Sequence, residues 1–228
     1  MTGSCLYPQG RLLVFGKAPV PGRVKSRLAP AWGPQGACRA YQHLFCHTLT
    51  TAVASRAAPV ELWCSPGRAH PWLRARAVEA GVALHAQPPG DLGRRMHRAL
   101  TTVLQRTPFA VIIGADCAGL AASHLRAALT ALDDGADAVF GPADDGGYVL
   151  VGLRRPEWSL FGNVPWGTGD VMDATRRRMR RLGWDWVELP ATADVDRPAD
   201  VRRLRRAGVL GGLACSGRGA LAAPGPGR

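Results

Sequence analysis

Residues 16–28, G-K-A-P-V-P-G-R-V-K-S-R-L, have the composition of a loop that binds phosphate. They follow a short apolar run, residues 12–15, that predicts a buried strand, and their two prolines and two glycines exclude a regular helix or strand through the middle. In such a loop the backbone N–H groups and the N-terminus of the next helix face an anion, while basic side chains neutralise it. Among the 29 Lys and Arg residues of the chain only two are lysines, and both of these compact charges lie in this loop. The residues that we expect to contact phosphate are Gly16, Lys17, Gly22, Arg23, Lys25 and Arg27, and the alternative is a solvated basic turn.

Aspartates follow two of the predicted strands. Asp116 comes soon after the strongly apolar run 109–113, and Asp194 and Asp196 follow a late strand at residues 186–189. An open α/β sheet binds its ligands at the carboxyl ends of its strands, where a hard divalent cation can bridge one or two carboxylates to substrate phosphates. We therefore expect Asp116 and Asp196 to hold Mg²⁺ or Mn²⁺. The alternative for both residues is capping of the helix that follows.

A further acidic segment, G-P-A-D-D-G-G-Y at residues 141–148, separates two predicted strands. Because Asp-Gly is a common turn pair, a hairpin turn is the interpretation that the sequence favours for Asp145.

The net charge of +12 raises the question of nucleic-acid binding. The densest basic runs, residues 176–181 and 202–206, have the pattern of exposed arginine-rich helix faces, and no aromatic platform is interleaved with them. We therefore expect nonspecific attraction to polyanions at low salt but no dedicated nucleic-acid function.

No apolar run approaches the roughly 20 residues that span a bilayer, and the N-terminus lacks the pattern of a signal peptide. The six cysteines show no C-x-x-C pair and no zinc-like spacing, so we expect free thiols. His43 and His47 stand one helical turn apart, but a structural role is favoured over a metal site because too few other ligands accompany them. These features predict a cytoplasmic protein without membrane contact, and they leave its oligomeric state open.

Predicted strands and helices alternate along the chain. This alternation predicts an α/β fold with a mostly parallel sheet and helices on both faces. We expect a single domain at residues 11–207, an N-terminal extension at residues 1–10, and a disordered Gly/Ala/Pro-rich tail at residues 208–228. The predicted strands are residues 12–15, 60–64, 82–85, 109–113, 138–140, 148–152 and 186–189, and the predicted helices are residues 34–55, 71–80, 91–105, 121–132, 169–182 and 198–206.

Five segments together resemble a known family. They are K-A-P-V-P-G-R-V-K-S-R-L, G-D-L-G-R-R-M, I-G-A-D-C-A-G-L, G-P-A-D-D-G-G-Y-V-L-V-G-L and D-V-D-R-P-A-D-V. Their order resembles that in GT-A-like glycosyltransferases associated with radical-SAM and selenodomain gene neighbourhoods, some of which are labelled arsenosugar-biosynthesis glycosyltransferases. K-S-R-L also resembles the guanylyltransferases that act on phospholactate or phosphoenolpyruvate. This resemblance implies a Rossmann-like nucleotide-diphospho-sugar transferase (GT-A) domain.

The resemblance also implies roles for individual residues. It places the four cations of residues 16–28 on nucleotide phosphates, Asp116 at the metal-binding aspartate, and Asp196 at a second metal ligand. Asp91, Gly146, Gly147 and Tyr148 would line the acceptor side. Two departures from the family pattern affect the expected site: Ala118 stands where proline is usual, and Asp144 stands where glutamate is common.

The resulting hypothesis is a metal-dependent transferase that takes an activated nucleotide and a small-molecule acceptor. Lys25, Asp116 and Asp145 are the expected catalytic residues, with Asp145 as a base or acceptor-positioning group. The leading reaction is glycosyl transfer from a nucleotide-diphospho-sugar. The alternatives are nucleotidyl transfer to a phosphate or phosphonate acceptor, with release of pyrophosphate, and a non-catalytic nucleotide-binding module.

Overall fold

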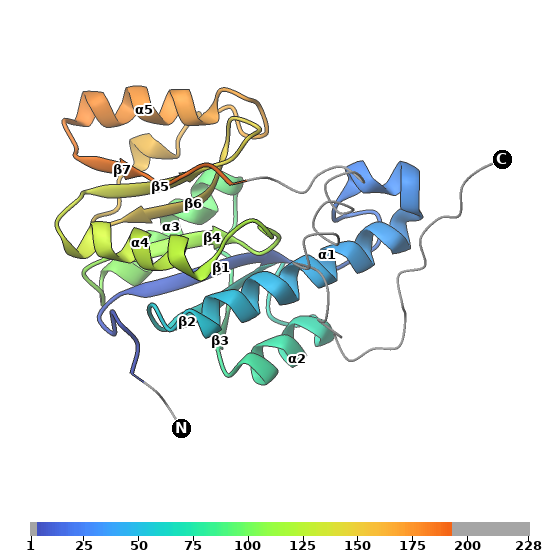
Figure 1. Ribbon diagram of the computed structural model, residues 1–228. Helices are drawn as coiled ribbons and strands as arrows, with labels where there is room; N and C mark the ends of the chain where they lie inside the picture. The colour runs from blue at the N-terminus through green and yellow to red at the C-terminus, as the bar shows by residue number, and fades with distance from the viewer. Residues whose placement is uncertain (1–3, 193–228) are drawn as a thin grey trace.

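The computed structural model describes residues 4–192, which form a single α/β domain (Figure 1). Its centre is a seven-stranded sheet in the order β3-β2-β1-β4-β6-β5-β7, in which β6 runs antiparallel to its neighbours β4 and β5 and the other pairings are parallel. The strands are β1 (Arg11–Lys17), β2 (Val60–Ser65), β3 (Ala83–Ala86), β4 (Ala110–Gly114), β5 (Ala138–Pro142), β6 (Tyr148–Leu153) and β7 (Trp186–Glu188). The prediction of a mostly parallel sheet is confirmed.

Helices cover both faces of the sheet, as the sequence predicts. The side chains of α1, α2 and α4 share one core cluster with the sheet, and those of α3 and α5 share the cluster on the opposite face (Figure 1). The helices are α1 (Ala29–Ala54), α2 (Pro71–Ala80), α3 (Leu92–Leu104), α4 (Ala122–Asp133) and α5 (Val171–Leu182), with short 3₁₀ turns η1 (Ser26–Leu28) and η2 (Trp158–Leu160).

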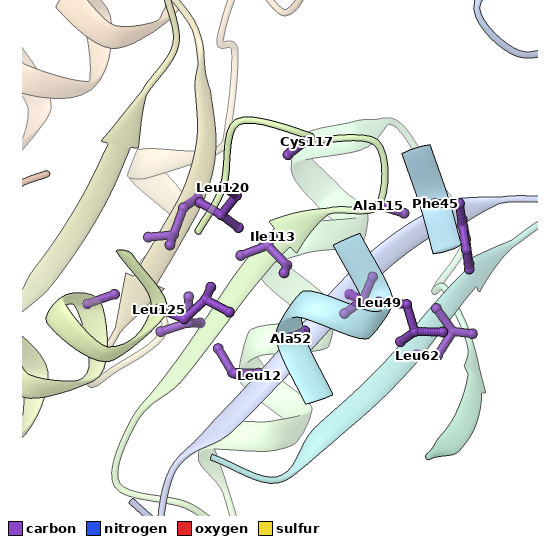
Figure 2. Packing of buried hydrophobic residues seen from close by; sticks show 14 of the residues in the cluster. Leu12, Phe45, Leu49, Ala52, Leu62, Ile113, Ala115, Cys117, Leu120 and Leu125 are labelled. Carbon is purple, nitrogen blue, oxygen red and sulfur yellow. The ribbon is translucent and has the colours of Figure 1, made fainter. Parts of the chain in front are cut away.

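The central strands are buried on both faces because nearly every residue in them is apolar. In β1, Leu12 contributes to the cluster under α1, while Leu13 contributes to the cluster under α3. Figure 2 shows Phe45 and Leu49 of α1 lying above β1 and its neighbouring strands, and both side chains are buried. This packing fixes the carboxyl ends of β1, β2 and β4, where the predicted site lies.

The largest departure from the predicted elements concerns the first helix. It begins at Ala29 rather than at residue 34, and Gly33, with φ of 66°, makes a kink immediately before Pro34. In a sequence, a proline within an apolar helical pattern indicates the start of a helix. Here two helical segments are joined by Gly33, whose left-handed backbone conformation makes the kink before Pro34.

The predicted helix at residues 198–206, the domain end at residue 207, the tail at residues 208–228, and Asp194 and Asp196 lie outside the described residues. No helix within residues 4–192 combines the length and apolar character needed to cross a bilayer.

The cysteines depart from the prediction at one position. Cys5, Cys38, Cys64 and Cys117 carry thiols, but Cys46 is disulfide-bonded, so the prediction of thiols throughout is wrong there. Cys215 lies outside the described residues.

Candidate functional site

The end of β1 is held by a buried tyrosine of α1. The hydroxyl of Tyr41 accepts a hydrogen bond from the backbone N–H of Lys17 at 2.7 Å and donates one to the carbonyl oxygen of Lys17 at 3.1 Å. Burial, reinforced by the nearby negative charge of Asp116, raises the pKa of Tyr41 well above its ordinary value, so the hydroxyl stays neutral. Tyr41 thereby fixes the direction in which the chain leaves the sheet and enters the basic loop.

Two further contacts fix the same strand end. Gly16 has no room for a side chain, because a Cβ atom there would lie 2.4 Å from the buried ring of Phe45. The carbonyl oxygen of Gly16 accepts a hydrogen bond of 3.0 Å from the amide nitrogen of Gln87, which also donates to the carbonyl of Trp63 at 3.0 Å. Gln87 therefore ties the end of β1 to the end of β2.

Lys25 and Asp116 form an ion pair at the junction of the basic loop with the end of β4. Their Nζ and Oδ2 atoms are 2.8 Å apart, and the Lys25 side chain is only 7% exposed, against 34% for Asp116. Lys25 has φ of 44° and ψ of 46°, a left-handed conformation that is uncommon for a residue with a side chain. Such backbone conformations gather at functional sites, where the surrounding structure maintains them.

Three cavities lie along this edge of the sheet and share lining residues. The first, of about 610 Å³, lies between the basic loop and the segment after β2 and is lined by Lys17, Arg23 and the apolar residues between them. The second, of about 320 Å³, shares Lys17 and Arg23 with the first and is also lined by Lys25 and Asp116. The third, of about 300 Å³, shares Lys25 and Asp116 with the second and extends between β4, β6 and the start of α3. Together they offer a continuous site whose centre carries the charged groups.

The structure brings most of the predicted phosphate ligands together. Four cationic side chains, those of Lys17, Arg23, Lys25 and Arg27, line the second cavity with Asp116. Gly22 adopts φ of 79° at an exposed turn of the same loop. The four predicted cations therefore face one cavity, as a polyanion site requires.

The residues predicted for the acceptor side are more dispersed. Tyr148 lines the third cavity. Asp91 caps α3, because its Oδ1 accepts a hydrogen bond of 2.8 Å from the backbone N–H of Arg94. The carboxylate of Asp145 accepts a hydrogen bond of 2.9 Å from the N–H of Gly147, which is the turn geometry that the sequence favours.

Gly146 in that turn lets the turn lie close to the segment that leads into α5. Its φ is 83°, and a Cβ atom would lie 2.1 Å from the carbonyl oxygen of Gly169. The N–H of Met172 donates a hydrogen bond of 2.9 Å to the carbonyl oxygen of Gly146, so this turn anchors the start of α5. Asp144, which stands where glutamate is common, is exposed.

Asp116 suits a magnesium-type cation only in combination with substrate oxygens. Within residues 4–192 no three His, Cys, Asp or Glu side chains form a group that could hold a metal ion. Mg²⁺ keeps several waters and is commonly bound through one or two carboxylates plus substrate phosphates. The partly exposed carboxylate of Asp116, in a cavity where four cations could hold substrate phosphates, fits this combination of carboxylate and phosphate oxygens. The second predicted ligand, Asp196, lies outside the described residues.

His47 of α1 is partly buried next to the backbone of Ala118, and this burial lowers the pKa of its imidazole. It therefore lies beside the loop that carries Asp116. The structural role expected for His43 and His47 stays a prediction.

Sequence reasoning misses Tyr41 and Gln87. Tyr41 lies within an apolar helical stretch, where an aromatic residue is ordinarily part of the core, and Gln87 lies in a short segment after a weak strand. Nothing in either local pattern indicates that the side chain bonds to the backbone of β1.

Comparison with known proteins gives one family match and similarity to solved structures. The DUF2064 family, described as an uncharacterized protein conserved in bacteria, matches residues 48–168. A crystal structure of a candidate nucleotide-diphospho-sugar transferase from Desulfovibrio desulfuricans G20 is 30% identical, with a TM-score of 0.79 and 88% of each chain covered. A search of curated proteins gives no match.

Two more distant structures share the fold alone. A cytidylyltransferase from Leptospira borgpetersenii is 13% identical with a TM-score of 0.58, covering 87% of this chain and 85% of that one. Rv0371c from Mycobacterium tuberculosis, in a complex with manganese, is 20% identical with a TM-score of 0.53, covering 86% of this chain and 97% of that one. The predicted fold class is therefore confirmed by both topology and comparison.

Proposed function

The chain belongs to the DUF2064 family, and from its site we propose that it is a metal-dependent transferase that moves a sugar from a nucleotide-diphospho-sugar to a small-molecule acceptor. The observation that carries this proposal is the order of the three cavities: an apolar one, a cationic one, and a second apolar one, each sharing two or more residues with the next. A nucleotide sugar has the same order of parts, namely a flat base, a diphosphate, and a sugar that meets its acceptor.

The first cavity suits the nucleoside. Its walls include Val20, Pro66 and His70, and it is the largest of the three at about 610 Å³. Lys17 and Arg23, at its boundary with the second cavity, would meet the phosphates that follow the nucleoside.

The second cavity suits the diphosphate. When the glycosidic bond breaks, negative charge accumulates on the departing nucleoside diphosphate, and preorganised cations stabilise it most effectively where water is excluded. Lys25 is best placed for this role because its ammonium group is largely buried and its position is fixed by Asp116. A divalent cation bound by Asp116 and the substrate phosphates would supply further neutralisation of that charge.

The similarity to the Desulfovibrio protein supports a nucleotide-sugar donor, since that protein is described as a candidate nucleotide-diphospho-sugar transferase and is 30% identical over nearly all of the fold. The five segments that resemble radical-SAM-associated glycosyltransferases support the same reaction.

Nucleotidyl transfer is the second candidate. The observation that favours it is the number of cations in one cavity, because four cationic side chains match a triphosphate at least as well as a diphosphate. In that reaction an acceptor oxyanion attacks the α-phosphorus and pyrophosphate leaves with the bond electrons.

A thermal-shift panel distinguishes these reactions and tests the proposal. Nucleoside triphosphates and nucleotide-diphospho-sugars are each added with Mg²⁺, Mn²⁺ or EDTA to wild-type protein and to Asp116→Asn. A ligand raises the melting temperature according to its affinity for the folded state. We expect a metal-dependent increase with one nucleotide sugar that Asp116→Asn reduces. An increase with triphosphates alone would instead support nucleotidyl transfer, and no increase with any nucleotide would refute both reactions.

A further inference from the structure

Resting on the proposed function, we propose that the acceptor is a small uncharged molecule with an apolar body and one hydroxyl group, bound in the third cavity. This inference goes beyond the reaction class because it names the chemistry of the second substrate. It is carried by the walls of the cavity, by its charge, and by one tyrosine hydroxyl.

The walls of the third cavity are apolar and come from both the sheet and α3. Phe15 of β1 and Val151 of β6 lie on the two strands that flank β4, Met96 belongs to α3, and Leu92 is the first residue of that helix. Leu92 is 41% exposed, so part of its apolar side chain is open to a ligand in the cavity. An acceptor with an apolar body would cover Leu92 and displace water from the cavity.

The charge of the third cavity disfavours an anion. Among its described lining residues the basic one is Lys25 and the acidic one is Asp116, and these two form an ion pair of 2.8 Å. A phosphate, phosphonate or carboxylate would therefore lose its hydration without gaining an additional counter-charge. An uncharged acceptor avoids this desolvation cost.

Tyr148 supplies a polar contact in this apolar cavity. Its ring makes edge contacts with Phe140 and Trp166, at centroid distances of 5.4 and 6.0 Å. Its hydroxyl makes no hydrogen bond to any residue within the described range 4–192, and burial raises its pKa, so it keeps its proton. A phenolic hydroxyl that lines a substrate cavity and lacks a partner is suited to bond the oxygen of an acceptor.

The aromatic wall behind Tyr148 is held in place. Gly93 allows the segment after η2 to lie against the start of α3, since a Cβ atom there would be 2.4 Å from the carbonyl oxygen of Phe161. The guanidinium of Arg178 donates hydrogen bonds of 2.7 to 2.9 Å to the backbone carbonyls of Ser159 in η2 and of Gly162 and Asn163 after it. The cavity is therefore largely formed before the acceptor binds, which lowers the entropic cost of binding.

The chemical step balances without any further reactant. The acceptor hydroxyl oxygen forms a bond to the anomeric carbon of the donor sugar. The bond from that carbon to the diphosphate oxygen breaks, and its electron pair leaves with the nucleoside diphosphate. The hydroxyl proton passes to the departing diphosphate, and the products are a neutral glycoside and a nucleoside diphosphate.

The test measures equilibrium binding of 2-naphthol, 4-methylphenol and the phosphate monoester of each, with a saturating nucleoside diphosphate and Mg²⁺ present so that the cationic second cavity is already filled. The proteins are the wild type, Leu92→Asp, Tyr148→Phe, and the control Val78→Asp, which also replaces an aliphatic side chain by aspartate, at an 81% exposed helical position of α2. Leu92 is exposed and is the first residue of α3, where the helix dipole favours an acidic side chain, so Leu92→Asp is expected to fold.

We expect each phenol to bind about tenfold or more tightly than its phosphate ester, because the ester carries a charge that the cavity does not balance. Leu92→Asp should weaken phenol binding about tenfold, and Tyr148→Phe about fivefold, the equivalent of one hydrogen bond. Val78→Asp should leave phenol binding unchanged.

Two results would overturn the acceptor class: esters that bind as tightly as the phenols, or phenol binding that is absent or insensitive to Leu92→Asp. A thermal-shift measurement with nucleotide sugars on the same proteins reports separately on the donor site. If the phenols bind as expected but no nucleotide sugar raises the melting temperature of any of these proteins, the proposed function is refuted, and with it the acceptor role of the cavity.

Discussion

Removal of the Tyr41 hydroxyl tests whether the end of β1 is positioned from α1. In Tyr41→Phe the ring keeps its edge contact with Phe45, whose centroid lies 6.0 Å away, so packing is preserved and only the hydroxyl is lost. The backbone N–H of Lys17 then loses an acceptor at 2.7 Å, and its carbonyl loses a donor at 3.1 Å. The perturbation is therefore confined to two hydrogen bonds at one position.

The expected loss of stability follows from those two bonds. Each contributes about 1 kcal/mol net, and an unsatisfied buried group costs about 1–3 kcal/mol, so the free energy of unfolding should fall by about 2 kcal/mol. For a domain of this size that corresponds to a decrease in melting temperature of about 4–8 °C. Since Lys17 lines both the apolar and the cationic cavity, affinity for nucleotides should fall several-fold in parallel.

The assay is urea denaturation followed by circular dichroism, with Tyr7→Phe as the matched control. The hydroxyl of Tyr7 lies 2.7 Å from Oγ1 of Thr130 in an exposed hydrogen bond, so its removal should cost about 0.5 kcal/mol or less. Equal losses of stability in the two variants would refute the conclusion that Tyr41 holds the strand end.

Two other predictions concern stability. Gly16→Ala should lower the free energy of unfolding by about 1–3 kcal/mol, because its Cβ atom would lie 2.4 Å from the buried ring of Phe45. The control Gly67→Ala, whose Cβ atom would meet no atom within 4 Å, should have little effect, and calorimetric melting of both variants checks this difference. Burial lowers the pKa of His47 below its ordinary value, so the unfolded state binds a proton more readily and stability should decrease as pH falls through about 6.5. His47→Asn should flatten that decrease in urea titrations between about pH 8 and 5, and an unchanged pH profile would contradict the role of His47.

Much of the fold is predictable from the sequence because its elements are strongly patterned. The α2 helix matches its predicted range, and most strands agree within one or two residues, since apolar runs end at glycines, prolines or charged residues. The basic loop is predictable for the same reason, because its four cations, two prolines and two glycines all lie within residues 16–28. The four cations of residues 16–28 do line one cavity with Asp116, although their role in phosphate binding stays a prediction.

The remainder of the site depends on contacts between residues that are distant in sequence. The pairing of Lys25 with Asp116 requires β1 and β4 to be neighbours, and this adjacency follows from sheet order rather than from any local pattern. Asp91 and Asp145 show the opposite case. Asp91 caps α3, and Asp145 makes the turn that the sequence favours, while the acceptor-side role that the family resemblance implies stays a prediction. The apolar cavity at Leu92 could not be predicted, because its walls come from β1, the basic loop, α3, β4 with the loop that follows it, and β6.

The central claim is that the basic loop binds the diphosphate of a nucleotide. Isothermal titration with nucleoside diphosphates, comparing wild-type protein with the double variant Lys17→Ala/Arg23→Ala and with the control Arg94→Ala on the exposed side of α3, tests it most directly. Both loop side chains are exposed, so the double variant should fold normally. We predict that it binds at least one nucleoside diphosphate about tenfold or more weakly than the wild type, while Arg94→Ala binds normally. Equal affinity in all three proteins, or no binding by the wild type, would contradict the claim.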